Sequence, residues 1–234
     1  MFSRTEVFQD RRDAGRELGH AILASGVWRG GQDGIVLGLP RGGVPVAYEV
    51  ALALHLPLDI VVVRKLGVPG FAELAMGAVA ANGVVALNAA IIHEFRIPEE
   101  VVDAAAKEEG QEVERRERAY RNGRSPEPTE GRLAILVDDG LATGASMLAA
   151  VRAVRPRARE VMVAVPVAAQ SACNDFRHEA DHFLCARVPW PFHSVGSFYR
   201  NFEQTTDEEV CSLLSKASGH RDELTGPLHE MVKS

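Results

Sequence analysis

Apolar residues in this chain gather in short continuous runs, and stretches of helical periodicity separate the runs. Unbroken apolar runs of this length are typical of parallel strands that are buried on both faces. They predict strands at residues 35–39, 59–63, 133–137, 160–165 and 183–186. The periodic stretches predict helices at residues 10–24, 44–55, 147–155 and 171–179. Strands that alternate with helices predict an α/β fold, in which a parallel twisted sheet is flanked by helices.

Two segments depart from this alternation. Residues 73–81 and 84–87 predict a β-hairpin about Asn82-Gly83, and a Gly- and Pro-containing loop at 67–71 precedes it, mobile by its composition. Residues 98–121 predict a long charged helix inside a helical insertion of about 89–121. Its apolar stripe is thin, so it could be a partner-contact arm, part of a hood or a solvated helix, the last being the default. The stripe is made by Val102, Ala106, Val113 and Tyr120.

Composition sets the limits within which a function must be sought. Hydrophobic residues make up 46% of the 234 residues and the net charge is -6, so no basic field favours nucleic acid. The three cysteines are widely spaced, and neither a signal peptide nor an apolar run of membrane-spanning length is seen. We expect a cytoplasmic protein without a membrane partner. One domain is expected at 1–216, with a final helix at 207–216 and a polar tail at 217–234.

The strongest chemical signal follows the apolar run at 133–137. Asp138 and Asp139 come directly after it, and Gly140 opens a turn of small residues before the next helix. Ligands of open α/β sheets bind beyond the carboxyl ends of the strands. Paired carboxylates there can accept hydrogen bonds from a diol or hold a divalent cation. Small residues at a helix N-terminus let backbone N–H groups surround a phosphate, so the pattern suits a ribose 5-phosphate.

Basic residues follow two other predicted strands. Arg41 stands beside Gly42 and Gly43 after the first strand, and Arg64-Lys65 ends the run at 59–63. Because parallel strands end at the same edge, we expect these groups to converge with the aspartates. Side chains alternate along a strand, so only one of Arg64 and Lys65 can point in a given direction. The sequence leaves open which one does.

The stretch at 133–146 resembles the binding motif for 5-phosphoribosyl 1-pyrophosphate (PRPP) of type I phosphoribosyltransferases. Neither a Walker A loop nor a Gly-x-Gly-x-x-Gly motif occurs. Within that family, the chain resembles bacterial members whose phosphoribosyltransferase activity is itself only predicted. It implies a Rossmann-like fold with a hairpin or loop lid, the helical insertion and a hood. It also implies that Mg²⁺ is the cofactor, held directly or indirectly by Asp138 and Asp139.

The same resemblance implies a role for each candidate residue. Ribose and 5-phosphate would be bound by Asp138, Asp139, Gly140, Ala142, Thr143, Gly144, Ala145 and Ser146. Pyrophosphate would be bound by Arg41, Gly42, Gly43 and Lys65. The catalytic group would comprise Asp138, Asp139, Arg41 and Lys65. A flexible loop from the hairpin region would close over the reacting sugar and exclude water.

The segment at 188–200 is rich in aromatic residues, proline and glycine, which predicts a structured hood or acceptor loop. Trp190, Phe198 and Tyr199 could stack on a planar base, although aromatic side chains in such loops more often pack the loop down. His178 and His182 match the zinc-protease pattern His-Glu-x-x-His. That chemistry needs both histidines on one helix face, and the strand expected from residue 183 leaves no room for the helix, so we interpret the match as chance.

Two functions from different classes remain at this point. The first is transfer of ribose 5-phosphate from Mg-PRPP to a nitrogenous base with release of pyrophosphate, a reaction of nucleotide metabolism. The second is a non-catalytic regulatory protein that senses PRPP or a nucleotide on the same fold. Similar enzymes are often dimers, so a homodimer is expected. The identity of the base and the general base do not follow from the sequence.

Overall fold

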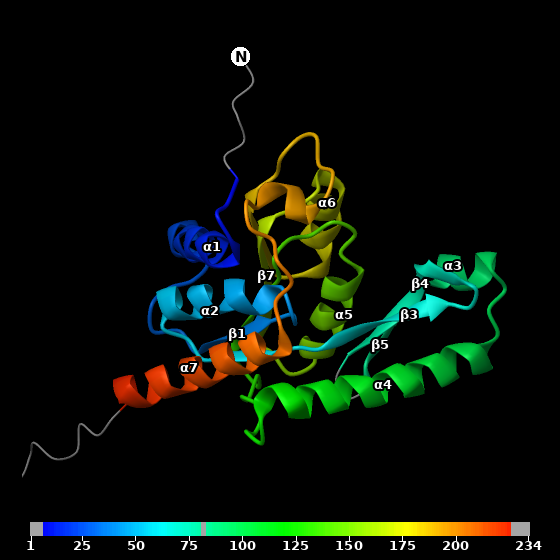
Figure 1. Ribbon diagram of the computed structural model, residues 1–234, viewed down its shortest axis with the longest axis horizontal. Helices are drawn as coiled ribbons and strands as arrows, with labels where there is room; N and C mark the ends of the chain where they lie inside the picture. Colours follow the sequence, from blue (N-terminus) through cyan, green and yellow to red (C-terminus); the bar gives the residue numbers. More distant parts are fainter. Residues whose placement is uncertain (1–6, 81–82, 226–234) are drawn as a thin grey trace, which may run out of the picture.

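A five-stranded parallel sheet with the strand order β2-β1-β6-β7-β8 forms the centre of the protein (Figure 1). The computed structural model describes residues 7–80 and 83–225. The strands are β1 (Gly34–Gly38), β2 (Leu58–Ile60), β6 (Leu133–Val137), β7 (Glu160–Val167) and β8 (His182–Arg187). All neighbours pair in parallel, so the loops that follow β1 and β6 lie next to each other at one edge, as the sequence predicts.

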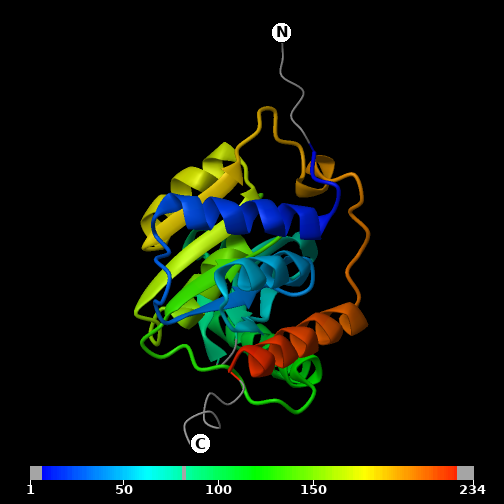
Figure 2. The same cartoon turned by 90° about the vertical axis from the view of Figure 1, so that its left-hand side faces the viewer.

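Helices cover both faces of this sheet (Figure 2). Alternate residues of each strand point to opposite faces, so Val36, Ile135 and Met162 pack in one core and Leu37, Leu136 and Val163 in the other. The first core is closed by α1 (Arg11–Ser25), α2 (Gly43–Leu54) and α7 (Asp207–Thr225). The second is closed by α5 (Ala145–Val154) and α6 (Gln170–Glu179). Burial on both faces explains the continuous apolar runs.

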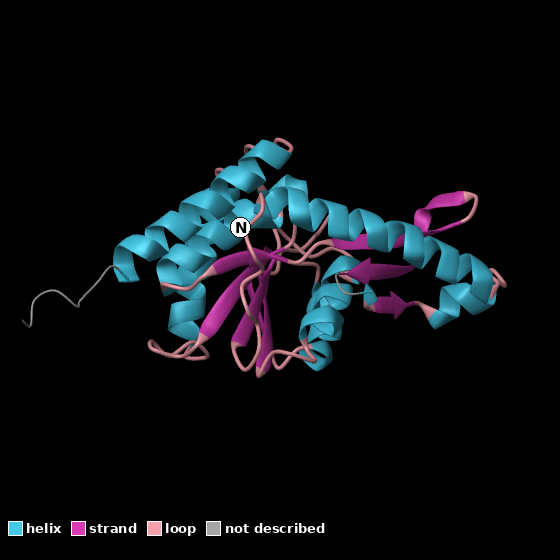
Figure 3. Cartoon of the chain, turned by 90° about the horizontal axis from the view of Figure 1, so that it is seen from below, coloured by secondary structure: helices cyan, strands magenta, loops and turns pink. Residues whose placement is uncertain are grey.

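A smaller antiparallel sheet extends from one side of this body (Figure 3). It consists of β3 (Val63–Val68), β4 (Phe71–Ala80) and β5 (Val85–Leu87). The insertion follows as α3 (Ala89–Glu94) and α4 (Glu99–Arg121), and α4 packs along β3 and β4. Val102, Val113 and Tyr120 are buried in the first core, so α4 is a packed helix rather than a solvated one.

The structure corrects two boundaries around the second strand. The run expected as one strand at 59–63 is divided, because β2 ends at Ile60 and Val63 already begins β3 in the other sheet. Arg64 and Lys65 therefore lie inside an antiparallel strand and not at the carboxyl end of a parallel one. An apolar run shows that its residues are buried, but it does not show at which residue the chain changes sheets.

The expected loop at 67–71 is also different. Gly67 and Val68 belong to β3, Phe71 begins β4, and Pro69-Gly70 forms the turn between them. Gly70 has a φ of 80°, which glycine adopts without strain. The segment is therefore the tight turn of the β3–β4 hairpin. The second hairpin, between β4 and β5, is confirmed, although Ala81 and Asn82 lie outside the described residues.

The remaining elements agree closely with the sequence. The helix expected to end at residue 216 continues to Thr225, so part of the predicted polar tail is helical. Val195–Phe198 form a short 3₁₀ helix within the segment 188–200. No helix within 7–80 and 83–225 combines the length and the apolar character that crossing a membrane requires.

Candidate functional site

Asp138 and Asp139 lie directly after β6, and hydrogen bonds and an ion pair hold them in place. The backbone N–H of Asp139 donates to Oδ1 of Asp138 at 2.8 Å. The Nε of Arg11, from α1, lies 2.9 Å from Oδ2 of Asp139. The hydroxyl of Tyr199 donates to the carbonyl oxygen of Asp139 at 2.5 Å. The pair is thus a rigid feature at the edge predicted for the ligand.

The loop with Arg41, Gly42 and Gly43 packs directly against this pair, which confirms the expected convergence for this loop but not for Arg64-Lys65. A Cβ atom on Gly42 would lie 2.1 Å from Oδ2 of Asp139. A Cβ atom on Gly43 would lie 2.7 Å from the carbonyl oxygen of Val137 and 2.9 Å from the Cα of Asp138. At Gly43 two backbone segments meet with no space for a side chain, whereas at Gly42 the space is taken by the side chains of Asp139 and Arg11.

The turn at 140–146 leads into α5 with the features of an anion site. Gly144 precedes α5 with a φ of 75° and supplies no capping side chain. A Cβ atom there would also lie 2.3 Å from Phe176, so only glycine fits. Ala142 and Thr143 are exposed, while Ala145 and Ser146 are partly buried. An uncapped helix N-terminus has unpaired N–H groups and a favourable dipole for a phosphate.

Arg41 is held by the last helix. Its Nη1 lies 3.5 Å from Oδ1 of Asp207, the first residue of α7, and Tyr120 donates to the same oxygen at 2.8 Å. The side chain of Arg41 is 35% exposed and that of Asp207 is 61% exposed. An ion pair as exposed as this is weak, so a bound anion can compete with Asp207 for Arg41.

The structure resolves the choice between Arg64 and Lys65. Arg64 donates to Glu109 of α4 at 2.7 Å, so it ties the insertion to β3. Lys65 is exposed and pairs in register with Ala78, on the face that also carries Val63 and packs on Ala149 of α5. Lys65 is therefore on the side of the motif helix, but the structure records no contact between it and Asp138, Asp139 or Arg41.

Comparison with known proteins bears on what such an edge does. The model of the phosphoribosyl transferase domain family matches residues 13–195, which include both loops and the aspartates. The chain belongs to this family. The central sheet with its flanking helices is accordingly a type I phosphoribosyltransferase fold.

Family relatives of known sequence and structure agree with this. The chain is 44% identical over 93% of its length to the Mycobacterium tuberculosis (strain H37Rv) protein named "Putative phosphoribosyl transferase Rv0571c". It spans about half of that relative, 48% of its length. The crystal structure of TT1426 from Thermus thermophilus matches with a TM-score of 0.77 and 40% identity, covering 90% of this chain and 98% of that one.

Burial shapes the electrostatics of the edge where the two aspartates lie. It raises the pKa of Asp138 well above its ordinary value, and the neighbouring charge of Asp139 raises it further. Burial also raises the pKa of Asp139, but the Arg11 guanidinium opposes that rise. Tyr199 has a raised pKa because it is buried and faces Asp139, so its hydroxyl keeps its proton and stays a donor. Arg11 is a cation in direct contact with Asp139.

Sequence reasoning missed Arg11. It lies 128 residues from Asp139 in the chain and belongs to no motif. Its charge on an otherwise amphipathic helix looks like any solvated arginine. Only the packing of α1 on α2 brings it over the loop of Gly42 and Asp139.

The carboxylates present suit a magnesium ion whose remaining ligands come from a substrate and from water. Among the described residues, no group of three or more His, Cys, Asp or Glu side chains could hold a metal. Mg²⁺ is commonly bound by one or two carboxylates together with substrate phosphates and water, and Asp138 and Asp139 can supply that share. The zinc pattern is confirmed as chance, because α6 ends at Glu179 and His182 begins β8.

The predicted acceptor residues are in different surroundings. Phe198 and Tyr199 are buried, and their rings contact Phe192 and Phe8 respectively, so they pack the loop down. Trp190 is 89% exposed. Val195 of the same loop packs on Gly140, where a Cβ atom would lie 2.5 Å from Val195 Cγ1. The loop thus covers the start of the turn at 140–146, and stacking on a base stays a prediction.

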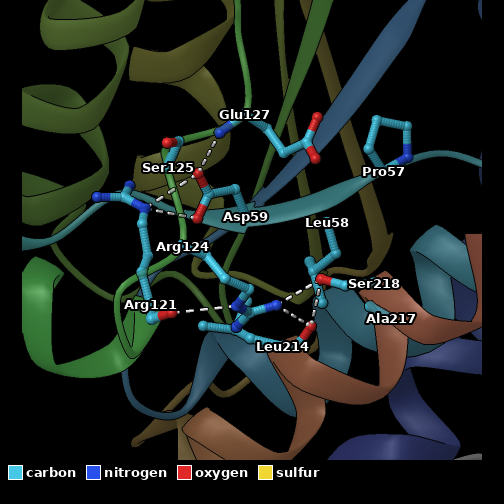
Figure 4. Close-up of a pocket in the computed structure, with 10 residues that line it drawn as sticks. All are labelled: Pro57, Leu58, Asp59, Arg121, Arg124, Ser125, Glu127, Leu214, Ala217 and Ser218. Carbon is cyan, nitrogen blue, oxygen red and sulfur yellow. Dashed lines mark hydrogen bonds and ion pairs between the residues drawn. The ribbon is translucent and has the colours of Figure 1, made fainter.

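A cavity of about 240 Å³ lies away from this edge, beside the amino end of β2 (Figure 4). Asp59 there accepts from Arg121 Nε at 2.9 Å and from the N–H of Glu127 at 2.9 Å. Arg124 donates to the carbonyl oxygen of Leu214 at 2.7 Å. These groups satisfy one another, so they form a joint between β2, the end of α4 and α7.

Proposed function

We propose that this chain is a phosphoribosyltransferase that uses Mg-PRPP to transfer ribose 5-phosphate to a nitrogenous base, with release of pyrophosphate. The observation that carries the proposal is the convergence at one sheet edge of the aspartate pair, the Gly42-Gly43 loop and the uncapped start of α5. Together they offer acceptors for a diol, a second anion site and a phosphate site, which are the three polar parts of PRPP.

The residues divide the work as follows. Asp138 and Asp139 accept hydrogen bonds from the ribose hydroxyls and would hold Mg²⁺. When bound, Mg²⁺ would neutralise negative charge on the pyrophosphate. The turn at 143–146 anchors the 5-phosphate and so fixes the anomeric carbon in line with the incoming nitrogen. As the bond to pyrophosphate breaks, negative charge grows on the leaving group. Arg41 and the amides of its loop stabilise that charge.

Arg41 must leave Asp207 to reach pyrophosphate. Their exposed pair is worth roughly 0–1 kcal/mol, so exchange for a multiply charged phosphate is favourable. Lys65 is a second candidate for the phosphates, because its side chain is exposed on the face of β3 that packs on α5. In this proposal the β3–β4 hairpin moves to bring Lys65 to the phosphates, as expected of a lid.

The test is pyrophosphate release from Mg-PRPP, screened over purine and pyrimidine bases. Release with one base would identify the acceptor and the reaction together. Binding of PRPP without release over the whole panel would favour the regulatory protein instead. The variant Asp138→Asn with Asp139→Asn should lose Mg-dependent PRPP binding in calorimetry while keeping its circular dichroism spectrum. Asp103→Asn, an exposed acid on α4, is the control. Wild-type affinity in the double variant would refute the site.

A further inference from the structure

Arg11 contacts the site but belongs to neither of the predicted binding loops. We propose that Arg11 is a positioning residue for the sugar: it fixes the carboxylate of Asp139 so that the remaining oxygen, Oδ1, stays available to a ribose hydroxyl. This inference rests on the proposed function and assigns a part of that site. It concerns how the chain distinguishes ribose from a sugar that lacks a hydroxyl.

Three contacts fix the guanidinium of Arg11. Its Nε lies 2.9 Å from Oδ2 of Asp139, and its Nη1 donates to the carbonyl oxygen of Glu203 at 2.6 Å. Its Cζ lies 3.9 Å from the centre of the Phe202 ring. Both partners of the ion pair are largely buried, with side chains 12% and 16% exposed. A planar group with several donors can make these contacts at once, whereas a lysine ammonium cannot reproduce this planar arrangement.

Asp139 is fixed from the other directions as well. Its N–H donates to Oδ1 of Asp138, and its carbonyl oxygen accepts from Tyr199. Within the described ranges, the hydrogen bonds from other residues to the two carboxylates end on Oδ1 of Asp138 and Oδ2 of Asp139. One acceptor oxygen on each adjacent aspartate is the arrangement that a vicinal diol can use. Without Arg11, the Asp139 carboxylate would be free to rotate and would repel that of Asp138.

The chain builds this support from two distant segments. The N–H of Phe8 donates to the carbonyl oxygen of Phe198 at 2.9 Å, and the N–H of Arg200 donates to the carbonyl oxygen of Phe8 at 2.8 Å. The N–H of Asn201 donates to Gln9 at 2.9 Å. Figure 2 shows the start of α1 beside the orange segment that leads to α7. This pairing carries Arg11, Tyr199 and Phe202 to Asp139 as one unit.

The neighbouring arginine provides a matched control. Arg12 follows Arg11 on α1 and also pairs with a carboxylate, Glu49 of α2, at 3.0 Å. It is 47% exposed and its guanidinium lies 5.2 Å from the Tyr48 ring. Removing Arg12 takes away the same charge from the same helix without touching Asp139. A difference between the two variants therefore reports the contact and not the net charge.

The experiment compares the affinities of ribose 5-phosphate and 2-deoxyribose 5-phosphate, measured by calorimetry for wild type, Arg11→Gln, Arg11→Lys and Arg12→Gln. A hydrogen bond to a charged group corresponds to roughly tenfold or more in affinity, so wild type should prefer ribose by about that ratio. The ratio should fall toward one in Arg11→Gln and part of the way in Arg11→Lys. It should be unchanged in Arg12→Gln. If Arg11→Gln does not fold, the ratio in Arg11→Lys decides.

Several outcomes would overturn the inference. An unchanged ratio with both affinities lowered would mean that Arg11 only supports the fold. Inorganic pyrophosphate is titrated in the same way. If Arg11→Gln loses more affinity for pyrophosphate than for ribose 5-phosphate, Arg11 binds the anion itself. Wild-type protein that binds neither sugar phosphate would refute the proposed function, and the inference would fall with it. Binding of ribose 5-phosphate with no preference over the deoxy sugar would refute the inference alone.

Discussion

The replacement of Gly42 by alanine tests the contact between the two loops most directly. Gly42 has a φ of -60°, so alanine meets no backbone strain and any effect comes from the added Cβ. That atom would lie 2.1 Å from Oδ2 and 2.9 Å from Cγ of Asp139, and 3.3 Å from Nε of Arg11. The Asp139 carboxylate must turn away, and its ion pair with Arg11 is then lost.

The magnitude follows from two opposing effects. Loss of a hydrogen bond between charged groups costs about 1.5–3 kcal/mol. Alanine in place of glycine reduces the entropy of the unfolded chain and returns about 0.4–1 kcal/mol. We expect a net loss of about 1–2 kcal/mol in the free energy of unfolding. For a domain of this size that lowers Tm by roughly 2–8 °C.

The assay is urea and thermal unfolding together with calorimetry of ribose 5-phosphate binding. Gly30→Ala is the control, because no atom lies within 4 Å of its added Cβ and its φ is not positive. Gly30→Ala should be neutral or slightly more stable than wild type. Gly42→Ala should lose stability and bind the sugar phosphate at least about tenfold more weakly, since each 1.4 kcal/mol is tenfold. Equal stability and affinity in the two variants would refute the packing argument.

Three further predictions concern charge. Arg41→Ala should lower kcat by about 10²–10³, the usual effect of removing one group that stabilises developing charge, and should weaken ribose 5-phosphate binding far less; equal losses would mean that Arg41 does not act on pyrophosphate. Asp59→Asn breaks the buried pair with Arg121, whose side chains are 7% and 11% exposed, and should cost about 1–3 kcal/mol in urea unfolding, because Arg121 stays buried with Glu117 as its remaining carboxylate partner. Arg118→Gln removes an exposed pair of 3.8 Å and should change stability by less than about 0.5 kcal/mol.

Local signals in the sequence predicted most of the fold. Apolar runs predicted all five strands of the parallel sheet, because burial on both faces leaves few polar positions in the central strands β1, β6 and β7. Asn82-Gly83 predicted the hairpin of β4 and β5. The division of residues 58–68 between β2 and β3 was not visible, since both strands contain apolar residues and pairing partners are set by distant segments. The aspartates and the loop of Arg41 were predicted because carboxyl ends of parallel strands meet at one edge.

The sequence by itself determined which residues stand at the ends of β1 and β6, since they follow directly on two apolar runs that predict parallel strands, and parallel strands end at the same edge of a sheet. Only the tertiary structure decided which cations serve which acids. Arg11 reaches Asp139 across 128 residues and Arg41 reaches Asp207 through the docking of α7. It also decided that Phe198 and Tyr199 fill the loop while Trp190 stays exposed. Periodicity reports whether a side chain is buried, but the partner of a buried or charged group depends on how helices pack on the sheet.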